Sequence, residues 1–173
     1  TEQEMFSMKE LIEAFSLERV GKSGARFSPD KAHWFNAQYM HTRNDEELAA
    51  IYTAQLAERS ITIDHEKALR IVSQIKMRAT FPDEFWALSS FLFEAPTTYD
   101  EKATKKYWKP DAPRIIGELK TLLEGIEEFT TEELEKVCGA WIAANQLGMG
   151  LVMNAWRLCI VGEPKGFGMY DMC

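Results

Sequence analysis

Helix-start signals recur along the whole chain, and they constrain its fold more than any other feature. Ser7 stands three residues before Glu10 in the pattern of a capping box, and Ser28 with Pro29 is a typical N-cap and first helical residue. Apolar residues at helical spacing follow these signals, whereas the strict alternation expected of a half-buried strand is nearly absent. Similar signals are Asn44 with Glu47, Asp64, Pro82, Pro113 and Thr130 with Glu133. The sequence therefore predicts an all-α fold of about eight to ten short helices.

Two of the predicted helices carry an apolar stripe that should face a core. The first stripe consists of Leu48, Ile51, Tyr52 and Leu56. The second consists of Leu69 and Val72, completed by either Ile75 or Met77.

The turn-rich stretch EAPTTYD, residues 94–100, is the best candidate for a boundary between subdomains. It divides the chain into a first helical subdomain, 1–94, with an entry linker at 1–28, and a second helical subdomain, 95–173. No internal repeat of fixed period is visible, which argues against a solenoid.

Charge and cysteine content restrict the possible partners and the compartment. The formal net charge of −7 argues against broad nucleic-acid binding but permits a local basic patch on an acidic body. No apolar run approaches the ~18 residues that span a bilayer, and the polar, acidic start TEQEMFSMKE is not a signal peptide. The odd cysteine count (Cys138, Cys159, Cys173) favours reduced thiols in the cytoplasm. We interpret Cys138 and Cys159 as small core residues, because both lie in apolar helical patterns.

The stretch RVGKSGARF, residues 19–27, contains a Gly-Lys-Ser that looks like the end of a nucleotide-binding loop. A Walker loop needs a further glycine before it, a preceding buried strand and a following helix. That glycine is missing, because Leu17 stands at its position. FSLERV is not a convincing strand, and Gly24 and Pro29 interrupt any helix directly after Ser23. We therefore interpret Lys22 and Ser23 as part of a linker.

Catalytic and metal-binding patterns do not stand out. His33, His41 and His65 are dispersed, and no acidic or cysteine partner completes a metal set with them. No Ser/His/Asp or Cys/His pairing has a recognisable local signature. The abundant acidic residues are expected on solvent faces. The residues alone thus indicate a helical module without visible catalytic machinery or a cofactor of its own.

A basic cluster provides one candidate for nucleic-acid contacts. Lys102, Lys105, Lys106 and Lys109 offer cations for phosphates, and the interleaved Tyr107 and Trp108 offer aromatic faces for bases. The alternative is a solvated helix face with one of these aromatic rings half-buried.

Two arginines and a late loop provide a second candidate. Arg78, at the end of a predicted helix, can present its planar fork to a base or phosphate, or satisfy the last carbonyls of that helix. Arg157 lies in the apolar stretch NAWRLCI, so an internal carboxylate or an external ligand should pair with it. Phe167 and Tyr170 in the loop GEPKGFGMY are either stacking surfaces or core residues.

Several stretches together resemble the C-terminal, anticodon-binding half of bacterial glutamyl-tRNA synthetase. They are FSLERVGKSGARFSPDKAHWFNAQYM, FLFEAPTTYDEKATKKYWKPDAP, GLVMNAWRLCIVG and MYDMC, and their order covers nearly the whole chain. The third stretch is similar to the family's G-x-V-x-Q-P-L-R-x-A-L-T-G, which it matches at Gly150, Val152, Arg157 and Gly162. Asn154, Ala155 and Trp156 replace its Gln-Pro-Leu.

The resemblance implies an all-α multi-helix cage of the class I aminoacyl-tRNA synthetase anticodon-binding type. It implies a monomer that binds tRNA(Glu) but neither DNA nor membranes. It also implies a catalytic half, which uses ATP and Mg²⁺, before Thr1, and a final helix cut off after Cys173. A non-catalytic helical protein-interaction module, using FWALSSFLF or the C-terminal loop, remains the alternative.

Residue by residue, the resemblance assigns anticodon contacts to two arginines and a loop. Arg78 matches an arginine that reads the third anticodon base, although a one-residue slip would place Met77 there. The remaining assigned residues are Arg157, Gly166, Phe167, Met169 and Tyr170. Lys102, Lys105 and Lys106 are candidates for phosphate contacts.

Overall fold

A computed structural model describes residues 3–21, 24 and 26–172 of the chain. Within these residues the structure consists of nine α-helices and three short 3-10 turns, without strands, which confirms the all-α prediction. Lys22, Ser23 and Cys173 lie outside the described residues, so the interpretation of Lys22 and Ser23 as a linker stays a prediction. In the described part of the chain, no helix combines the length and the apolar character needed to cross a membrane.

The chain divides into two compact units, Thr1–Phe85 and Trp86–Cys173. This division precedes the boundary predicted at 94/95, and the assignment of separate roles to 1–94 and 95–173 stays a prediction. The first unit holds α1 (Met8–Ala14), α2 (Pro29–Thr42), α3 (Asp45–Ala57) and α4 (His65–Ile75). The 3-10 turns are Leu17–Arg19, Pro82–Glu84 and Ser90–Leu92, and α5 (Phe85–Ser89) spans the division.

Side-chain caps start the helices where the sequence predicts them. The Ser7 hydroxyl accepts a hydrogen bond from the Glu10 amide (3.3 Å), and the Ser7 amide donates to the Glu10 carboxylate (2.7 Å), which completes the capping box. The Asp64 carboxylate accepts from the Lys67 amide (2.7 Å) at the start of α4. Because the amides of a first helical turn have no partner within the helix, these caps fix where each helix begins.

The core of the first unit lies mainly between α3 and α4, which pack against each other. Leu48, Tyr52 and Leu56 of the predicted stripe are buried. The Phe85 ring meets Tyr52 edge to face, with 6.0 Å between ring centroids. On α4, Ile75 is the buried member of the predicted pair, since the helix ends there and Met77 beyond it is 56% exposed.

Helix α1 has no buried residue. Its apolar side chains Met8 and Ile12 are 73% and 70% exposed, and Phe15 directly after the helix is also exposed. The capping box, rather than core packing, holds this short helix in the structure.

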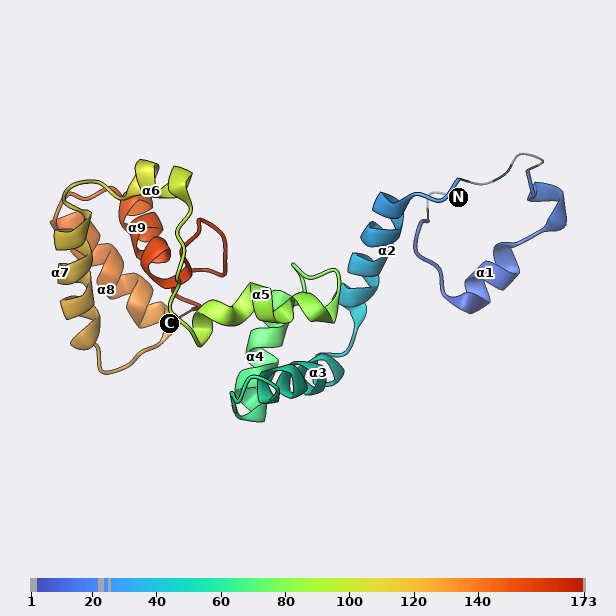
Figure 1. Cartoon of the computed structure of the whole chain (residues 1–173), viewed down its shortest axis with the longest axis horizontal. Coiled ribbons are helices and arrows are strands. Elements are labelled where there is room, and N and C mark those ends of the chain that lie inside the picture. Colours follow the sequence, from blue (N-terminus) through green and yellow to red (C-terminus); the bar gives the residue numbers. More distant parts are fainter. Residues whose placement is uncertain (1–2, 22–23, 25, 173) are drawn as a thin grey trace. The chain divides into compact units, whose positions relative to one another are not determined.

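The second unit is built around α9 (Met149–Val161), which contacts α6 (Glu101–Tyr107), α7 (Ala112–Glu124) and α8 (Thr131–Ala144) (Figure 1). One buried cluster joins α7, α8 and α9 to the loop that follows α9. Its members are Ile115, Leu119, Cys138, Ile142, Val152, Trp156 and Met169. The burial of Cys138 agrees with its prediction as a core residue, whereas Cys159 is half-buried. Burial raises the pKa of both thiols, which favours their protonated form.

Candidate functional site

Arg157 lies on α9 and holds the loop that follows this helix. Its side chain is half-buried, and its Nη1 donates a hydrogen bond to the backbone carbonyl of Phe167 over 2.7 Å. The sequence led us to expect a carboxylate or an external ligand as the partner. A backbone carbonyl was missed because main-chain acceptors leave no residue-type signal. The contact ties the guanidinium to the loop backbone, ten residues further along the chain.

The loop leaves α9 at Gly162, whose position admits only glycine. Gly162 has a φ of 81° in the left-handed region, and a Cβ there would collide with the Thr98 carbonyl oxygen. The Gly162 carbonyl also accepts a hydrogen bond from the Asp100 amide over 2.8 Å. The turn-rich connection 94–100 therefore packs against the end of α9 and fixes where the loop begins.

Gly166 brings the loop backbone close to Arg157. Its φ of 132° is a conformation that side-chain-bearing residues rarely adopt. A Cβ at this position would lie only 3.0 Å from Nη1 of Arg157. The glycine thus provides the space that the guanidinium occupies.

Phe167 and Met169, predicted to contact the anticodon, are core residues in this structure. Their side chains are 4% and 5% exposed. The Phe167 ring packs edge to face against Phe91, with ring centroids 5.5 Å apart and an interplanar angle of 69°. Of the two interpretations drawn from the sequence, burial favours the core, because no face of the Phe167 ring is open to a base.

Tyr170 is half-buried with its hydroxyl turned inward. Its ring meets Trp156 edge to face at 6.2 Å between centroids. The hydroxyl is buried and has no hydrogen-bond partner among the described residues. Burial, with smaller contributions from Cys138 and Glu135, raises the pKa of this phenol, so it stays protonated at neutral pH.

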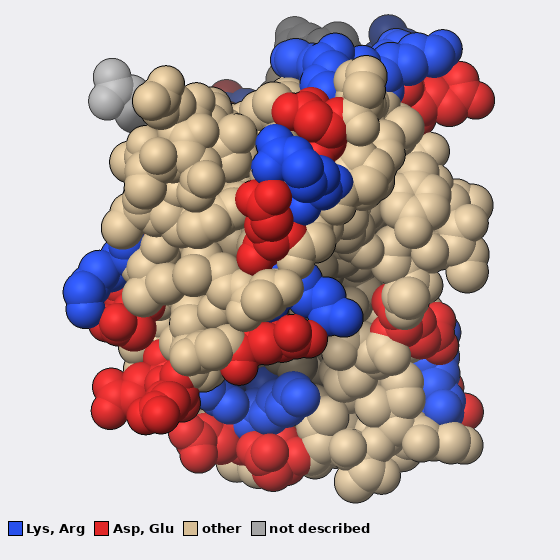
Figure 2. Space-filling view, turned by 90° about the vertical axis from the view of Figure 1, so that its left-hand side faces the viewer, with Lys and Arg blue, Asp and Glu red and all other residues tan. Residues whose placement is uncertain are grey.

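Lys102, Lys105 and Lys106 of the predicted lysine cluster lie on α6, and Lys109 lies just beyond its end. The Asp100 carboxylate caps this helix by accepting a hydrogen bond from the Ala103 amide (2.6 Å). Lys102, Lys105 and Lys106 are exposed, and none of them has a carboxylate partner within the described part of the chain. Figure 2 shows blue side chains at the upper edge of the view, with red ones beside them, at the height where Figure 1 places α6. Tyr107 is half-buried, and Lys106 Nζ lies 5.0 Å from the centroid of its ring. A half-buried ring is what we predicted for the alternative, a solvated helix face.

The basic residues of α7 and α8 are matched with carboxylates, Lys136 of α8 with Glu133 (2.9 Å). On α7, Arg114 pairs with Glu118 (2.7 Å) and Lys120 with Glu124 (3.6 Å). Among α6, α7 and α8, the lysines without a carboxylate partner in the described part of the chain therefore lie on α6, while α7 presents charges of both signs.

Arg78 belongs to the first unit, directly after α4. Its backbone amide donates to the Ile75 carbonyl over 2.9 Å, and its side chain is exposed. Met77, the alternative position for a base contact, is exposed as well. Both side chains thus reach solvent at the end of the same helix.

The histidines take part in separate local contacts. His65 Nε2 lies 2.8 Å from a Glu46 carboxylate oxygen, and the His33 ring packs edge to face against Phe81. No group of three or more His, Cys, Asp or Glu side chains suited to a metal ion occurs among the described residues.

The structure contains a surface cavity between α7 and α8 that we did not predict from the sequence. Its rim contains glutamates that we had assigned to solvent faces. The acidic run before Thr130 was its only sequence signal, and that signal does not distinguish a rim from an ordinary surface.

Comparison with known proteins identifies close relatives of the whole chain. Residues 38–173 match the family model described as an anticodon binding domain. Glutamate–tRNA ligases of Flavobacterium johnsoniae and Bacteroides fragilis are 46% and 43% identical to this chain over 172 and 171 residues, 99% of its length. The chain spans only 34% of each of these relatives.

Solved structures give the same result. A crystal structure of a glutamate tRNA ligase from Elizabethkingia meningosepticum, in complex with its amino acid, superposes with a TM-score of 0.88 at 39% identity. The match covers 97% of this chain and 33% of that protein.

Proposed function

The chain belongs to the anticodon-binding family of glutamate–tRNA ligases, and from this premise we propose that it recognises the anticodon stem-loop of tRNA(Glu). The chain matches the anticodon-binding region of these ligases and not their catalytic domain. Attachment of glutamate to tRNA(Glu), with ATP and Mg²⁺ as cofactors, is then the activity of a longer enzyme. We propose that this enzyme is a cytoplasmic monomer that binds neither DNA nor membranes. The alignment with about a third of the relatives' length supports this division.

The Arg157–Phe167 hydrogen bond is the observation that carries the proposal. It joins a half-buried cation to the loop of Gly166, Phe167, Met169 and Tyr170. In this proposal Arg157 contacts a base or phosphate at its solvent side while it fixes the loop from within. An arginine suits both tasks because its planar fork donates in several directions.

The buried loop residues act as supports. Phe167 and Met169 anchor the loop in the core, and Gly166 allows its backbone to approach Arg157 and the RNA closely. Unstacked anticodon bases need new partners. We propose that the loop backbone and Tyr170 supply them.

The lysines of α6 are proposed to contact the phosphates of the stem. They lack competing carboxylates, which would otherwise screen a phosphate from Lys102, Lys105 and Lys106. This placement reconciles the formal charge of −7 with RNA binding, since a few local contacts suffice.

Substitution of Arg157 in the longer ligase tests the main role. Arg157→Ala should weaken charging of tRNA(Glu), while binding of glutamate and ATP stays nearly intact. Arg114→Ala is the matched control, because Arg114 is an exposed arginine paired with Glu118 on α7. An equal loss of ATP binding in Arg157→Ala would reject the specific role.

Arg78 is proposed to read the third anticodon base, with Met77 as the alternative. Charging of transcripts varied at that base should show a changed preference in Arg78→Ala but not in Met77→Ala. An unchanged preference in both variants would remove this assignment.

The alternative of a protein-interaction module using residues 85–93 has less support. Phe85 is fully buried against Tyr52, and the Trp86 ring stacks on Phe93 at 6.1 Å between centroids. Much of this apolar surface is therefore occupied within the chain. Titration of the longer ligase with anticodon stem-loop RNA at several salt concentrations separates the two functions, since only the first predicts salt-dependent RNA binding.

A further inference from the structure

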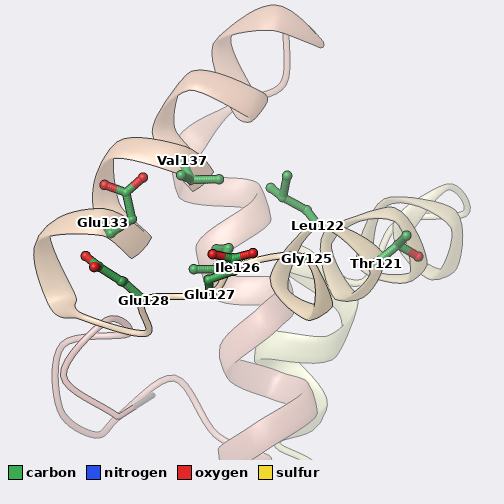
Figure 3. A pocket seen from close by; sticks show the side chains of 8 residues that line it. All are labelled: Thr121, Leu122, Gly125, Ile126, Glu127, Glu128, Glu133 and Val137. Carbon is green, nitrogen blue, oxygen red and sulfur yellow. The ribbon is translucent and has the colours of Figure 1, made fainter.

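The end of α7 and the start of α8 border an open surface cavity of about 580 Å³ within the second unit. The last turns of α7, the connection 125–130 and the first turns of α8 form its walls (Figure 3). The lining residues are Thr121, Leu122, Gly125, Ile126, Glu127, Glu128, Glu133 and Val137.

The floor of the cavity is apolar. Leu122, Ile126 and Val137 are half-buried, and Figure 3 shows Leu122 and Val137 on facing helices. Phe129, in the connection between the helices, is 48% exposed. Leu122 also packs against the core cluster of the unit, so the floor is held in place from behind. A rigid apolar floor can accept an apolar side chain from another molecule.

The rim of the cavity is negatively charged. Glu133 pairs with Lys136 over 2.9 Å, whereas Glu127 and Glu128 have no ion-pair partner among the described residues. The carbonyl end of α7 adds partial negative charge at the same place. A phosphate is therefore repelled here, and a cationic group is attracted.

We propose that this cavity docks a basic segment of a separate protein, in which lysine or arginine residues flank one apolar side chain. The apolar side chain enters between Leu122 and Val137, and the flanking cations pair with Glu127 and Glu128. Charge complementarity selects this occupant over RNA, and the apolar floor selects it over a simple cation.

The test uses the 173-residue chain and a fluorescein-labelled peptide, Gly-Lys-Arg-Leu-Lys-Arg-Gly, in fluorescence-anisotropy titrations. The double variant Glu127→Gln/Glu128→Gln should weaken binding about tenfold, because each rim ion pair contributes about threefold. Glu132→Gln/Glu135→Gln is the charge-matched control, since both residues are exposed on α8 and line no part of the cavity. Equal weakening in both double variants would overturn the proposal by showing unspecific attraction.

Two further arms test the apolar contact and the position. A peptide with Ser in place of Leu should bind at least several-fold more weakly, and equal binding would overturn the proposal. Thr121→Arg places a cation at the cavity wall from an exposed position and should abolish peptide binding without changing the melting curve. Retained binding in Thr121→Arg would place the peptide elsewhere.

The source of the occupant is tested with the longer ligase. Peptide binding that persists there supports a separate partner, whereas its loss shows that the enzyme covers the cavity itself and overturns the proposal. Competition by anticodon stem-loop RNA would also overturn it. Glu127→Gln/Glu128→Gln should bind anticodon stem-loop RNA as strongly as the unchanged ligase does. Its loss of peptide binding is then independent of the proposed anticodon function.

Discussion

Replacement of Gly166 by alanine should destabilise the second unit through two separable causes. The first is backbone strain: a φ of 132° costs a residue with a Cβ about 2 kcal/mol. The second is displacement of Arg157, because the new Cβ would lie 3.0 Å from its Nη1. Losing the 2.7 Å hydrogen bond from that atom to Phe167 costs about 1.5 kcal/mol, the low end for a charged donor, since the site is half-buried. The expected total is about 3.5 kcal/mol.

A double-mutant cycle with Arg157→Ala separates these causes. Without the guanidinium, the Cβ meets only ordinary contacts, at 3.7 Å from Met172 Sδ and 3.8 Å from Val161 Cγ2. Gly166→Ala should then cost only its strain, so the double variant is more stable than the sum of the single changes by about 1.5 kcal/mol.

The assay is urea unfolding of the four proteins, followed by far-UV circular dichroism. Additivity within about 0.5 kcal/mol would refute the reasoning, because it would show that Gly166 and Arg157 do not share their space. A second readout is RNA binding by the corresponding longer ligases. If Arg157 positions the loop, Gly166→Ala should weaken RNA binding when Arg157 is present. In a protein that already carries Arg157→Ala, the same change should weaken RNA binding little further.

Three further outcomes follow from the packing and caps of the helices. Leu119→Ala, at a buried position of α7, should lower the free energy of unfolding by about 2–5 kcal/mol, whereas Leu119→Met should cost less than about 1.5 kcal/mol, both measured in urea. Thr130→Ala removes the cap of α8 and should cost about 1 kcal/mol, with Thr130→Ser retaining most of the stability; equal losses would mean that the cap contributes nothing. The hydrogen bond from the Lys67 amide holds the pKa of Asp64 below its ordinary value of 3.8, so this carboxylate stabilises the fold above the unfolded-state pKa and loses that contribution as pH falls through the folded-state pKa. Thermal unfolding between pH 7 and pH 3 should therefore show a shallower pH dependence for Asp64→Asn, which keeps a capping oxygen without a charge; an unchanged slope contradicts this.

Local signals in the sequence were sufficient for the helices. Ser7, Ser28 and Asp64 cap helices as predicted because an N-cap depends on atoms only two or three residues away. The choice between Ile75 and Met77 as the inward residue was left open by periodicity. It was decided by the end of α4 at Ile75, which depends on the packing of the unit.

The candidate site was only partly predictable, because its contacts join distant residues. The sequence singled out Arg157 and the loop after it, but not the carbonyl of Phe167 as the partner. The burial of Phe167 and Met169 depends on neighbours such as Phe91 in a distant segment. Loops with glycines and aromatic residues are compatible with both an exposed and a buried ring, so only the fold decides.

The short helix α1 has its capping box but no core packing to stabilise it. A helix of seven residues is not stable by itself in water, and none of its side chains is buried here. Its backbone amides should therefore exchange with solvent within the dead time of a hydrogen-exchange experiment whenever nothing covers Met8 and Ile12. Slow exchange in this segment would in turn report that a neighbouring surface has docked. The hydrogen exchange of α1 therefore shows, without any added label, whether another surface covers this helix.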